Sequence, residues 1–330
     1  MTRFVPSGIL FLAGILVISA CRYQPQADEL PFNVNPPEPP NLAEVQMTSA
    51  DLPLGMGELR LGLSPSSASR TADDFVPMTD YLATLLDVPI RTIDVASYSE
   101  LIDLAVAGEV ELALLPPLSY VLANERSPQV RVIAQQMSFG ATTYSSYVLI
   151  KADDPSGELA DLKGRRVAFV DQYSTSGFLF PYAAFLAHGI DPERDFDYTF
   201  AGGHAQVVRL LASNDADAAA TASGSAREHA KGNGSADETQ ADVRILYKAG
   251  RIPYDALCST GGLNERAIKK VQGAMLHINT RDRRGRLALR STHSITGWIP
   301  ADDQRYEPVR KVQAVVREHL EKAKHATEAD

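Results

Sequence analysis

Short apolar runs alternate with amphipathic stretches along the chain from residue 58 onward. Residues 59–63 and 90–95 are short and rich in apolar or β-branched side chains, which predicts strands. Between them, residues 75–86 place apolar side chains at helical spacing, which predicts an amphipathic helix. Strand and helix signals that alternate in this way predict a mainly parallel sheet covered on both faces.

The same alternation continues to the end of the chain, with a second cycle after the polar stretch 153–157. Further strands are expected at 111–115, 130–135, 146–150, 166–170, 197–200, 216–221 and 243–247, and further helices at 101–106, 118–124, 178–188, 206–212, 265–276 and 309–320. The segment 250–256 would return to the first lobe, so two crossings would form a hinge with a ligand cleft between the lobes.

We therefore expect an α/β fold with two lobes. The first lobe would comprise residues 58–148 and 249–330, and the second lobe residues 149–248.

The first residues predict an export signal. A charged residue, Arg3, precedes an apolar stretch that is too short to span a bilayer, and small residues follow it. Residues 17–21, Val-Ile-Ser-Ala-Cys, resemble a bacterial lipobox, in which the cysteine is lipidated and becomes the mature N-terminus. Residues 1–20 would then be a lipoprotein signal peptide and Cys21 the membrane anchor; an ordinary signal peptide cleaved nearby is the alternative.

Residues 21–57 carry seven prolines with few aromatic residues, and we expect this segment to be a disordered linker that does not pack. A Pro-rich chain extends by about 3 Å per residue. The 36 residues from 22 to 57 could therefore hold the folded body up to roughly 100 Å from its anchor.

Charge and motif content narrow the possible functions. The chain has 32 Lys and Arg against 41 Asp and Glu, a formal net charge of −9, which argues against a broad basic surface for nucleic acid. The densest basic run, residues 281–286, is expected to be a solvated loop or helix end. No Walker loop, H-E-x-x-H or complete dinucleotide-binding glycine motif occurs, so we expect neither a cofactor nor a metal. If Cys21 is acylated, Cys258 has no partner for an intramolecular disulfide.

The most informative chemistry lies at residues 167–181, where an apolar strand ends in Ser174, Thr175, Ser176 and a glycine just before a helix. Backbone N–H groups at a helix start have no intrahelical partners, and the positive end of the helix dipole lies there too. Three added hydroxyls predict an oxyanion site. Plain helix capping is the alternative for such a motif taken alone.

A second helix start, Gly202-Gly203-His204, strengthens the hypothesis of an anion site. The two glycines allow close approach of the backbone to a ligand, and the histidine can donate a hydrogen bond.

Several motifs together carry a family resemblance. They are Leu-Leu-Pro-Pro-Leu-Ser-Tyr at 114–120, Asp-x-x-Ser-Thr-Ser-Gly-x-x-x-Pro at 171–181, Gly-Gly-His at 202–204, Asp217 with its alanine run, and Ile-Pro-Tyr-Asp at 252–255. In this order, over about residues 59–318, the chain resembles the substrate-binding proteins of phosphate, phosphite and phosphonate ABC transporters. The resemblance implies a two-lobed, type II-like periplasmic binding protein. Such a protein closes on a phosphorus oxyanion and delivers it to a membrane permease with an ATPase partner.

The resemblance also implies a ligand shell. By position, the ligand-binding residues would be Tyr98, Tyr144, Ser174, Thr175, Ser176, His204 and Asp255. The two tyrosines would wall the cleft, although either one alone would be interpreted as a core or interface aromatic. Asp255 is an acceptor when ionised, so beside an anion it needs a protonated ligand oxygen, a ligand amine or an orienting partner such as His204. A simple turn residue after Pro253 is the other interpretation of Asp255.

Two departures from the family pattern narrow the ligand. Relatives that bind aminoalkyl phosphonates hold the amine with an acidic residue where this chain has Ala222 to Ser225, and many relatives have an acid where this chain has Ala205. A buried ammonium without its partner costs several kcal/mol. Phosphite, methylphosphonate or phosphate is therefore the expected ligand.

Two other functions are possible from the sequence. The binding module could serve a membrane sensor instead of a permease. Ser176, His204 and Asp255 could also form the triad of an exported hydrolase, but three adjacent hydroxyls at a helix start suit passive binding better than one activated nucleophile. We therefore expect a binding protein, not an enzyme, held outside the cytoplasm by its lipid anchor.

Overall fold

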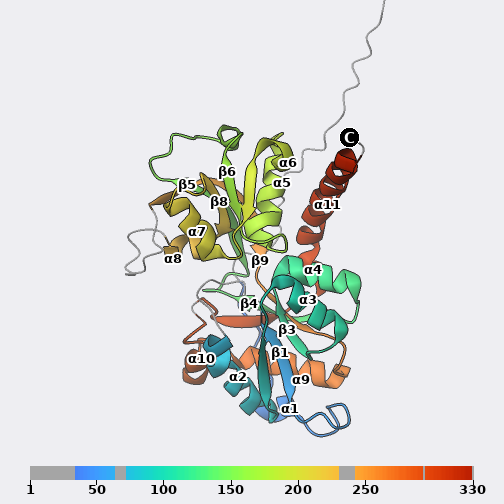
Figure 1. Cartoon of the computed structure of the whole chain (residues 1–330). Coiled ribbons are helices and arrows are strands. Elements are labelled where there is room, and N and C mark those ends of the chain that lie inside the picture. Colours follow the sequence, from blue (N-terminus) through green and yellow to red (C-terminus); the bar gives the residue numbers. More distant parts are fainter. Residues whose placement is uncertain (1–33, 64–71, 230–241, 293, 329–330) are drawn as a thin grey trace, which may run out of the picture.

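Two α/β lobes make up the computed structural model, which describes residues 34–63, 72–229, 242–292 and 294–328 (Figure 1). Each lobe is built around one sheet, and helices cover the sheets. The predicted two-lobed α/β fold is confirmed.

The first sheet has the order β11-β4-β10-β3-β1-β2. Its strands are β1 (Leu59–Leu63), β2 (Ile90–Asp94), β3 (Leu112–Leu115), β4 (Arg131–Met137), β10 (Ala256–Ser259) and β11 (Gly297–Pro300). Strands β2, β1 and β3 are parallel, and β10 runs antiparallel between β3 and β4. The helices of this lobe include α2 (Ala72–Leu86), α3 (Tyr98–Ala107), α4 (Pro117–Arg126), α9 (Glu265–His277) and α10 (Arg283–Ala288).

The second sheet repeats this plan in the order β7-β6-β8-β5-β9. Its strands are β5 (Thr143–Lys151), β6 (Arg166–Phe169), β7 (Asp197–Phe200), β8 (Ala218–Ala222) and β9 (Val243–Pro253). Strands β7, β6 and β8 are parallel, and β5 runs antiparallel between β8 and β9. The helices are α5 (Phe180–Ala187), α6 (Pro192–Asp195), α7 (His204–Ala212) and α8 (Ser223–His229).

Two crossings join the sheets. The chain leaves β4 through a turn in which Phe139 and Gly140 have φ angles of 49° and 80°, and it returns between β9 and β10. The predicted lobe borders after residues 148 and 248 fall inside β5 and β9, although both strands belong wholly to the second sheet. The polarity pattern shows where a strand lies but not which sheet it joins, because pairing depends on distant segments.

Helix α11 (Glu307–Glu328) follows the short helix η3 (Asp303–Tyr306) and extends from the first lobe along α5 of the second (Figure 1). In the first lobe, the Tyr306 hydroxyl donates to the Tyr254 carbonyl at 2.9 Å. On the other side, His319 Nε2 lies 2.9 Å from Asp191 Oδ1. One continuous core of buried apolar side chains runs through both lobes along α4, the start of α5 and α11.

The segment from residue 34 to residue 57, here called the strap, packs on the first lobe. Val45 and Met47 are buried in the core beside α9, and the short helix α1 (Leu42–Val45) contacts that helix. The Asp51 side chain is fully buried, with Arg266 Nε at 2.8 Å and Lys270 Nζ at 3.0 Å. Burial raises the pKa of Asp51, but hydrogen bonds from the Thr48 backbone and from Lys270 outweigh it and lower the pKa to about 2.

The prediction that residues 22–57 do not pack is therefore wrong for the strap. Prolines remove backbone donors but keep their carbonyls, and His277 Nε2 donates to the Pro40 carbonyl at 2.8 Å. Residues 22–33, Cys21 and the predicted signal peptide lie outside the described residues. Within the described part of the chain, no helix is long and apolar enough to cross a membrane.

Candidate ligand-binding site

Five of the seven candidate residues follow the carboxyl ends of parallel strands. Tyr98 is the first residue of α3 after β2, the hydroxyl triplet 174–176 follows β6, and His204 is the first residue of α7 after β7. Ligands of open α/β sheets bind at this edge. Residues 64–71, which follow β1 at the same edge, lie outside the described residues.

Three other predicted residues, Tyr98, Ser176 and Asp255, lie close enough to the Tyr144 hydroxyl to affect its pKa. Burial raises the pKa of Tyr144 well above its usual value, and the Asp255 carboxylate and the Tyr98 hydroxyl add to the rise. A hydrogen bond with the Ser176 side chain acts in the opposite direction. The four residues come from β5, the β9–β10 connection, α3 and the turn after β6, so the cluster joins both lobes.

A residue that the sequence analysis passed over, Tyr254, completes the aromatic wall. Its ring stacks on the Tyr144 ring with centroids 5.2 Å apart and an interplanar angle of 29°. Tyr254 precedes Asp255 in the Ile-Pro-Tyr-Asp motif, so the motif that predicts Asp255 as a ligand group also contains this tyrosine.

Each of the three adjacent hydroxyl residues does something different. Ser174 Oγ accepts from the Gly177 N–H at 3.0 Å, which is a helix-cap bond. Thr175 Oγ1 accepts from the Leu118 N–H at 2.9 Å and so links the second lobe to the first turn of α4. Ser176 bonds to Tyr144 through its side chain. A hydroxyl that accepts one bond still has its own hydrogen to donate, so the first two can cap and bind together.

The triplet opens a π-helical turn, η2 (Thr175–Leu179), and not the regular helix start at 178 that the sequence predicts. Gly177 is essential to its shape, because a Cβ there would lie 2.3 Å from Val170 Cγ2. Ser146 Oγ donates to the Ser176 carbonyl at 2.7 Å. Contacts from β5 and β6 thus fix the turn before any ligand arrives, and single π-helical turns are frequent at functional sites.

His204 is held from the neighbouring strand β8. Its Nδ1 lies 2.8 Å from Thr221 Oγ1, and the Ala222 N–H donates to the same nitrogen at 3.4 Å. A backbone N–H can only donate, so these partners assign Nδ1 as the acceptor and place the proton on Nε2. In a hydrolytic triad, Nδ1 would face a carboxylate; here it faces Thr221 and Ala222.

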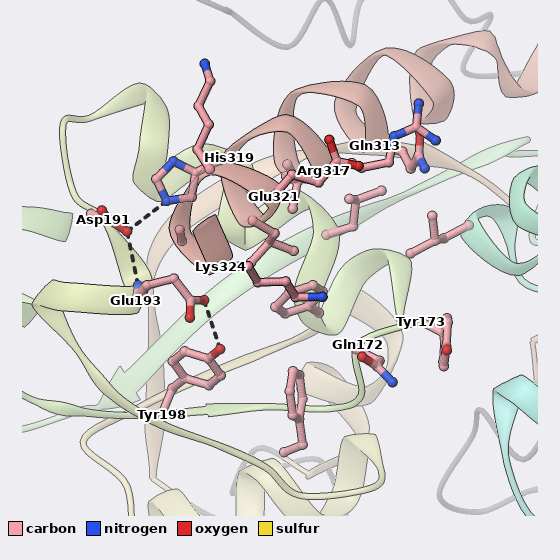
Figure 2. A pocket seen from close by; sticks show the side chains of 18 of the residues that line it. Gln172, Tyr173, Asp191, Glu193, Tyr198, Gln313, Arg317, His319, Glu321 and Lys324 are labelled. Carbon is pink, nitrogen blue, oxygen red and sulfur yellow. Dashed lines mark hydrogen bonds and ion pairs between the residues drawn. The ribbon is translucent and has the colours of Figure 1, made fainter. Parts of the chain in front are cut away.

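A separate cavity of about 920 Å³ lies between α11 and the second lobe (Figure 2). None of the seven predicted residues lines it. Two of its carboxylates have partners: Glu193 Oε1 accepts from the hydroxyls of Tyr198 and Tyr182 at 2.9 and 3.0 Å, and Asp191 pairs with His319. Basic side chains, among them Arg194, Arg317 and Lys324, line the cavity beside these carboxylates. We keep the candidate site at the strand ends, because ligands of open α/β sheets bind there.

Residues 61–306 match the family described as ABC transporter, phosphonate, periplasmic substrate-binding protein. The chain belongs to this family. Its members are binding proteins of transporters, which confirms the prediction of a binding protein and not an enzyme.

Similar proteins agree with this assignment. The phosphate-import protein PhnD of Mycolicibacterium smegmatis is 32% identical over 154 residues, which are 43% of this chain and 47% of that protein. The alignment thus spans about half the length of this relative.

Solved structures share the fold. PhnD1 from Prochlorococcus marinus, in complex with methylphosphonate, superposes with a TM-score of 0.69 at 19% identity, covering 79% of this chain and 98% of that one. A binding component of a phosphonate ABC transporter from Pseudomonas aeruginosa also gives a TM-score of 0.69 at 19% identity, covering 79% and 87%.

Proposed function

We propose that this protein captures a small phosphorus oxyanion between its lobes and delivers it to an ABC permease with its ATPase partner. The observation that carries the proposal is that Ser176 hydrogen-bonds to the Tyr144 side chain while Tyr98 and Asp255, from two further segments, lie near enough to raise its pKa. Such convergence of polar groups from both lobes is typical of a ligand site.

Neutral donors would bind the negative oxygens of the ligand. They are the N–H groups and hydroxyls of the η2 turn, the start of α7, and His204 Nε2. Asp255 would accept from a protonated ligand oxygen, which selects an oxyanion that keeps one proton at neutral pH. Phosphite, methylphosphonate and phosphate share this chemistry.

The same site disfavours a ligand with an amine. Where an acid would hold the ammonium, the chain has Ala222 to Ser225, and Ser223 Oγ accepts from the Ser145 N–H at 3.3 Å. A buried ammonium without a counter-charge costs several kcal/mol. Two relatives fit this ligand class: one is a phosphate-import protein, and the structure of another was solved with methylphosphonate.

We further propose that Cys21 is acylated and holds the protein outside the cytoplasm, on the periplasmic side in a Gram-negative cell. The family's description as periplasmic supports the extracytoplasmic part. Delivery to a membrane sensor is the alternative role, and the genes beside this one distinguish it from transport.

Calorimetry and thermal unfolding with phosphite, phosphate, methylphosphonate and 2-aminoethylphosphonate test the ligand class. A ligand at about one hundred times its dissociation constant adds about 2.7 kcal/mol to the free energy of unfolding. We expect one or more of the first three to stabilise the protein and the amine-bearing compound to do so least. If none of the four binds, the proposed class is wrong; hydrolysis of a bound ester would favour the enzyme alternative.

A further inference from the structure

Five exposed arginines gather at helix α10, on a surface that the proposed ligand site does not use. They are Arg281, Arg283, Arg284, Arg286 and Arg290, and we call them the arginine surface. The sequence predicts a solvated loop or helix end here. The structure places this run of arginines beside exposed apolar side chains and beside the start of the strap.

Few of the five guanidinium groups of the arginine surface are held by side-chain partners, although Arg284 hydrogen-bonds to the Tyr81 side chain. Among the described residues, Arg281 alone of the five forms an ion pair, with Glu38 at 4.0 Å. Arg286 donates to two backbone carbonyls, and Asp282 accepts from the Gly285 N–H as the helix cap. Asp73 and Asp74 open the adjacent helix α2 and offset part of the charge. Five arginines against these two carboxylates, Glu38 and Asp282 leave a small positive excess, in a chain whose net charge is −9.

Exposed apolar side chains lie within the same surface. Leu287, on α10 itself, is 49% exposed, and Phe139 is 80% exposed in the first crossing. Thr296 connects Phe139 to the start of the arginine run. The Phe139 N–H donates to Thr296 Oγ1 at 2.8 Å, and the N–H of Thr280, which precedes Arg281, donates to the Thr296 carbonyl at 3.0 Å. Exposed apolar side chains among arginines are the composition of surfaces that lie at a membrane interface.

The strap leaves the folded body at this same surface. The Val34 N–H donates to the Gly140 carbonyl, next to Phe139, at 3.2 Å, and Glu38 faces Arg281. Twelve residues lie between Cys21 and Val34, and the thirteen steps from one Cα to the other span at most about 45 Å. An anchor at Cys21 therefore keeps the arginine surface near the bilayer.

We propose that the arginine surface docks on the headgroups of anionic phospholipids, as a second membrane attachment beside the acylated cysteine. Guanidinium groups bind phosphate with paired hydrogen bonds, and stable membrane attachment commonly combines an acyl anchor with a basic patch. The expectation that this surface lies near the bilayer rests on the proposed lipid anchor. Its charge and its exposed apolar side chains do not depend on that anchor.

The test uses the full processed chain in vesicles of phosphatidylcholine, either alone or with about one third phosphatidylglycerol. An environment-sensitive dye on Leu287→Cys reports docking, because Cys258 is buried. We expect a blue shift with the anionic vesicles, which high salt removes. Each arginine near an anionic surface contributes about fivefold, so Arg283→Gln with Arg284→Gln should lower the docked fraction relative to the undocked by roughly 25-fold.

The matched control, Arg209→Gln with Lys311→Gln, removes the same charge from exposed positions on α7 and α11 and should leave docking unchanged. Equal spectra in both lipids would overturn the proposal, as would a shift that appears only after the permease is added. Mass spectrometry of Cys21 tests the anchor separately. If no acyl group is found, sedimentation of the labelled chain with the same vesicles decides: retention that requires phosphatidylglycerol supports the surface, and no retention overturns it.

Discussion

The η2 turn and the arginine surface are both suited to anions, but they are built in opposite ways. The η2 turn is buried, is shaped by Gly177 and presents neutral donors from backbone and hydroxyl groups. The arginine surface is exposed and presents full charges on long side chains. The difference teaches that burial with fixed dipoles gives selectivity for one shape, whereas exposed charge gives attraction to many anions at a cost in specificity.

Gly177→Ala is expected to have the largest effect, because it should disturb the η2 turn and leave the arginine surface intact. The added methyl group would clash with Val170, distort the turn and remove at least two hydrogen bonds to a charged ligand. At about 1.5 kcal/mol for each bond, ligand affinity should fall about 100-fold. Calorimetry measures this loss, and vesicle docking should not change. In contrast, the methyl group of Gly57→Ala meets no atom within 4 Å and should leave both unchanged.

Ionic strength separates the two regions without any mutation. Exposed charges are screened by salt, whereas buried bonds are screened much less. Between low and high salt, vesicle docking should weaken by about tenfold or more, while the ligand dissociation constant changes by less than about threefold. A ligand affinity that falls as steeply as docking would mean that exposed charge also dominates the candidate site.

Two neighbouring serines sharpen the account of the turn. Ser176→Ala should weaken ligand binding by about tenfold, because its side chain lies in the cluster around Tyr144. Ser174→Ala removes a cap bond and should cost about 1 kcal/mol of stability, with a smaller effect on affinity. Calorimetry measures the ligand affinity of both variants, and thermal unfolding measures their stability. A larger loss of affinity in Ser174→Ala than in Ser176→Ala would contradict these two roles.

The smallest effect concerns the strap that brings the chain to the arginine surface. Asp51 has its pKa lowered to about 2, so its contribution to stability is complete above about pH 4 and is lost as the pH falls toward 2. Asp51→Asn should remove about 1 kcal/mol at neutral pH and flatten this part of the pH profile. Thermal unfolding between pH 2 and pH 7 measures both; a variant with the native profile would show that other groups hold the strap.

Local patterns predicted the elements well where a strand or helix has its own polarity signal. The strands at 59–63 and 197–200 were predicted with the bounds that the structure has. Each is a short run between turn residues, so its extent depends on local sequence.

The features that could not be predicted from the sequence depend on contacts between residues far apart in the chain. The strap is held by Arg266 and Lys270, more than 200 residues later in the chain, and no pattern near Asp51 announces them. In the candidate site, the residue types at 174–176 indicated an anion turn. The separate duties of Ser174, Thr175 and Ser176 depend on Gly177, Leu118 and Tyr144, whose positions only the fold determines.

The packed strap shortens the distance over which the proposed lipid anchor would let the folded body reach a permease. If Cys21 is the anchor, an unpacked linker of 36 residues would let the folded body lie up to roughly 100 Å from it. Because the strap is packed, the span from Cys21 to Val34 is at most about 45 Å. Because the accessible volume scales with the cube of that distance, the effective concentration of the body around a permease within reach rises by roughly tenfold. Because 24 residues pack onto α9 and its neighbours, the folded body would reach less far from its anchor but would meet a permease within reach more often.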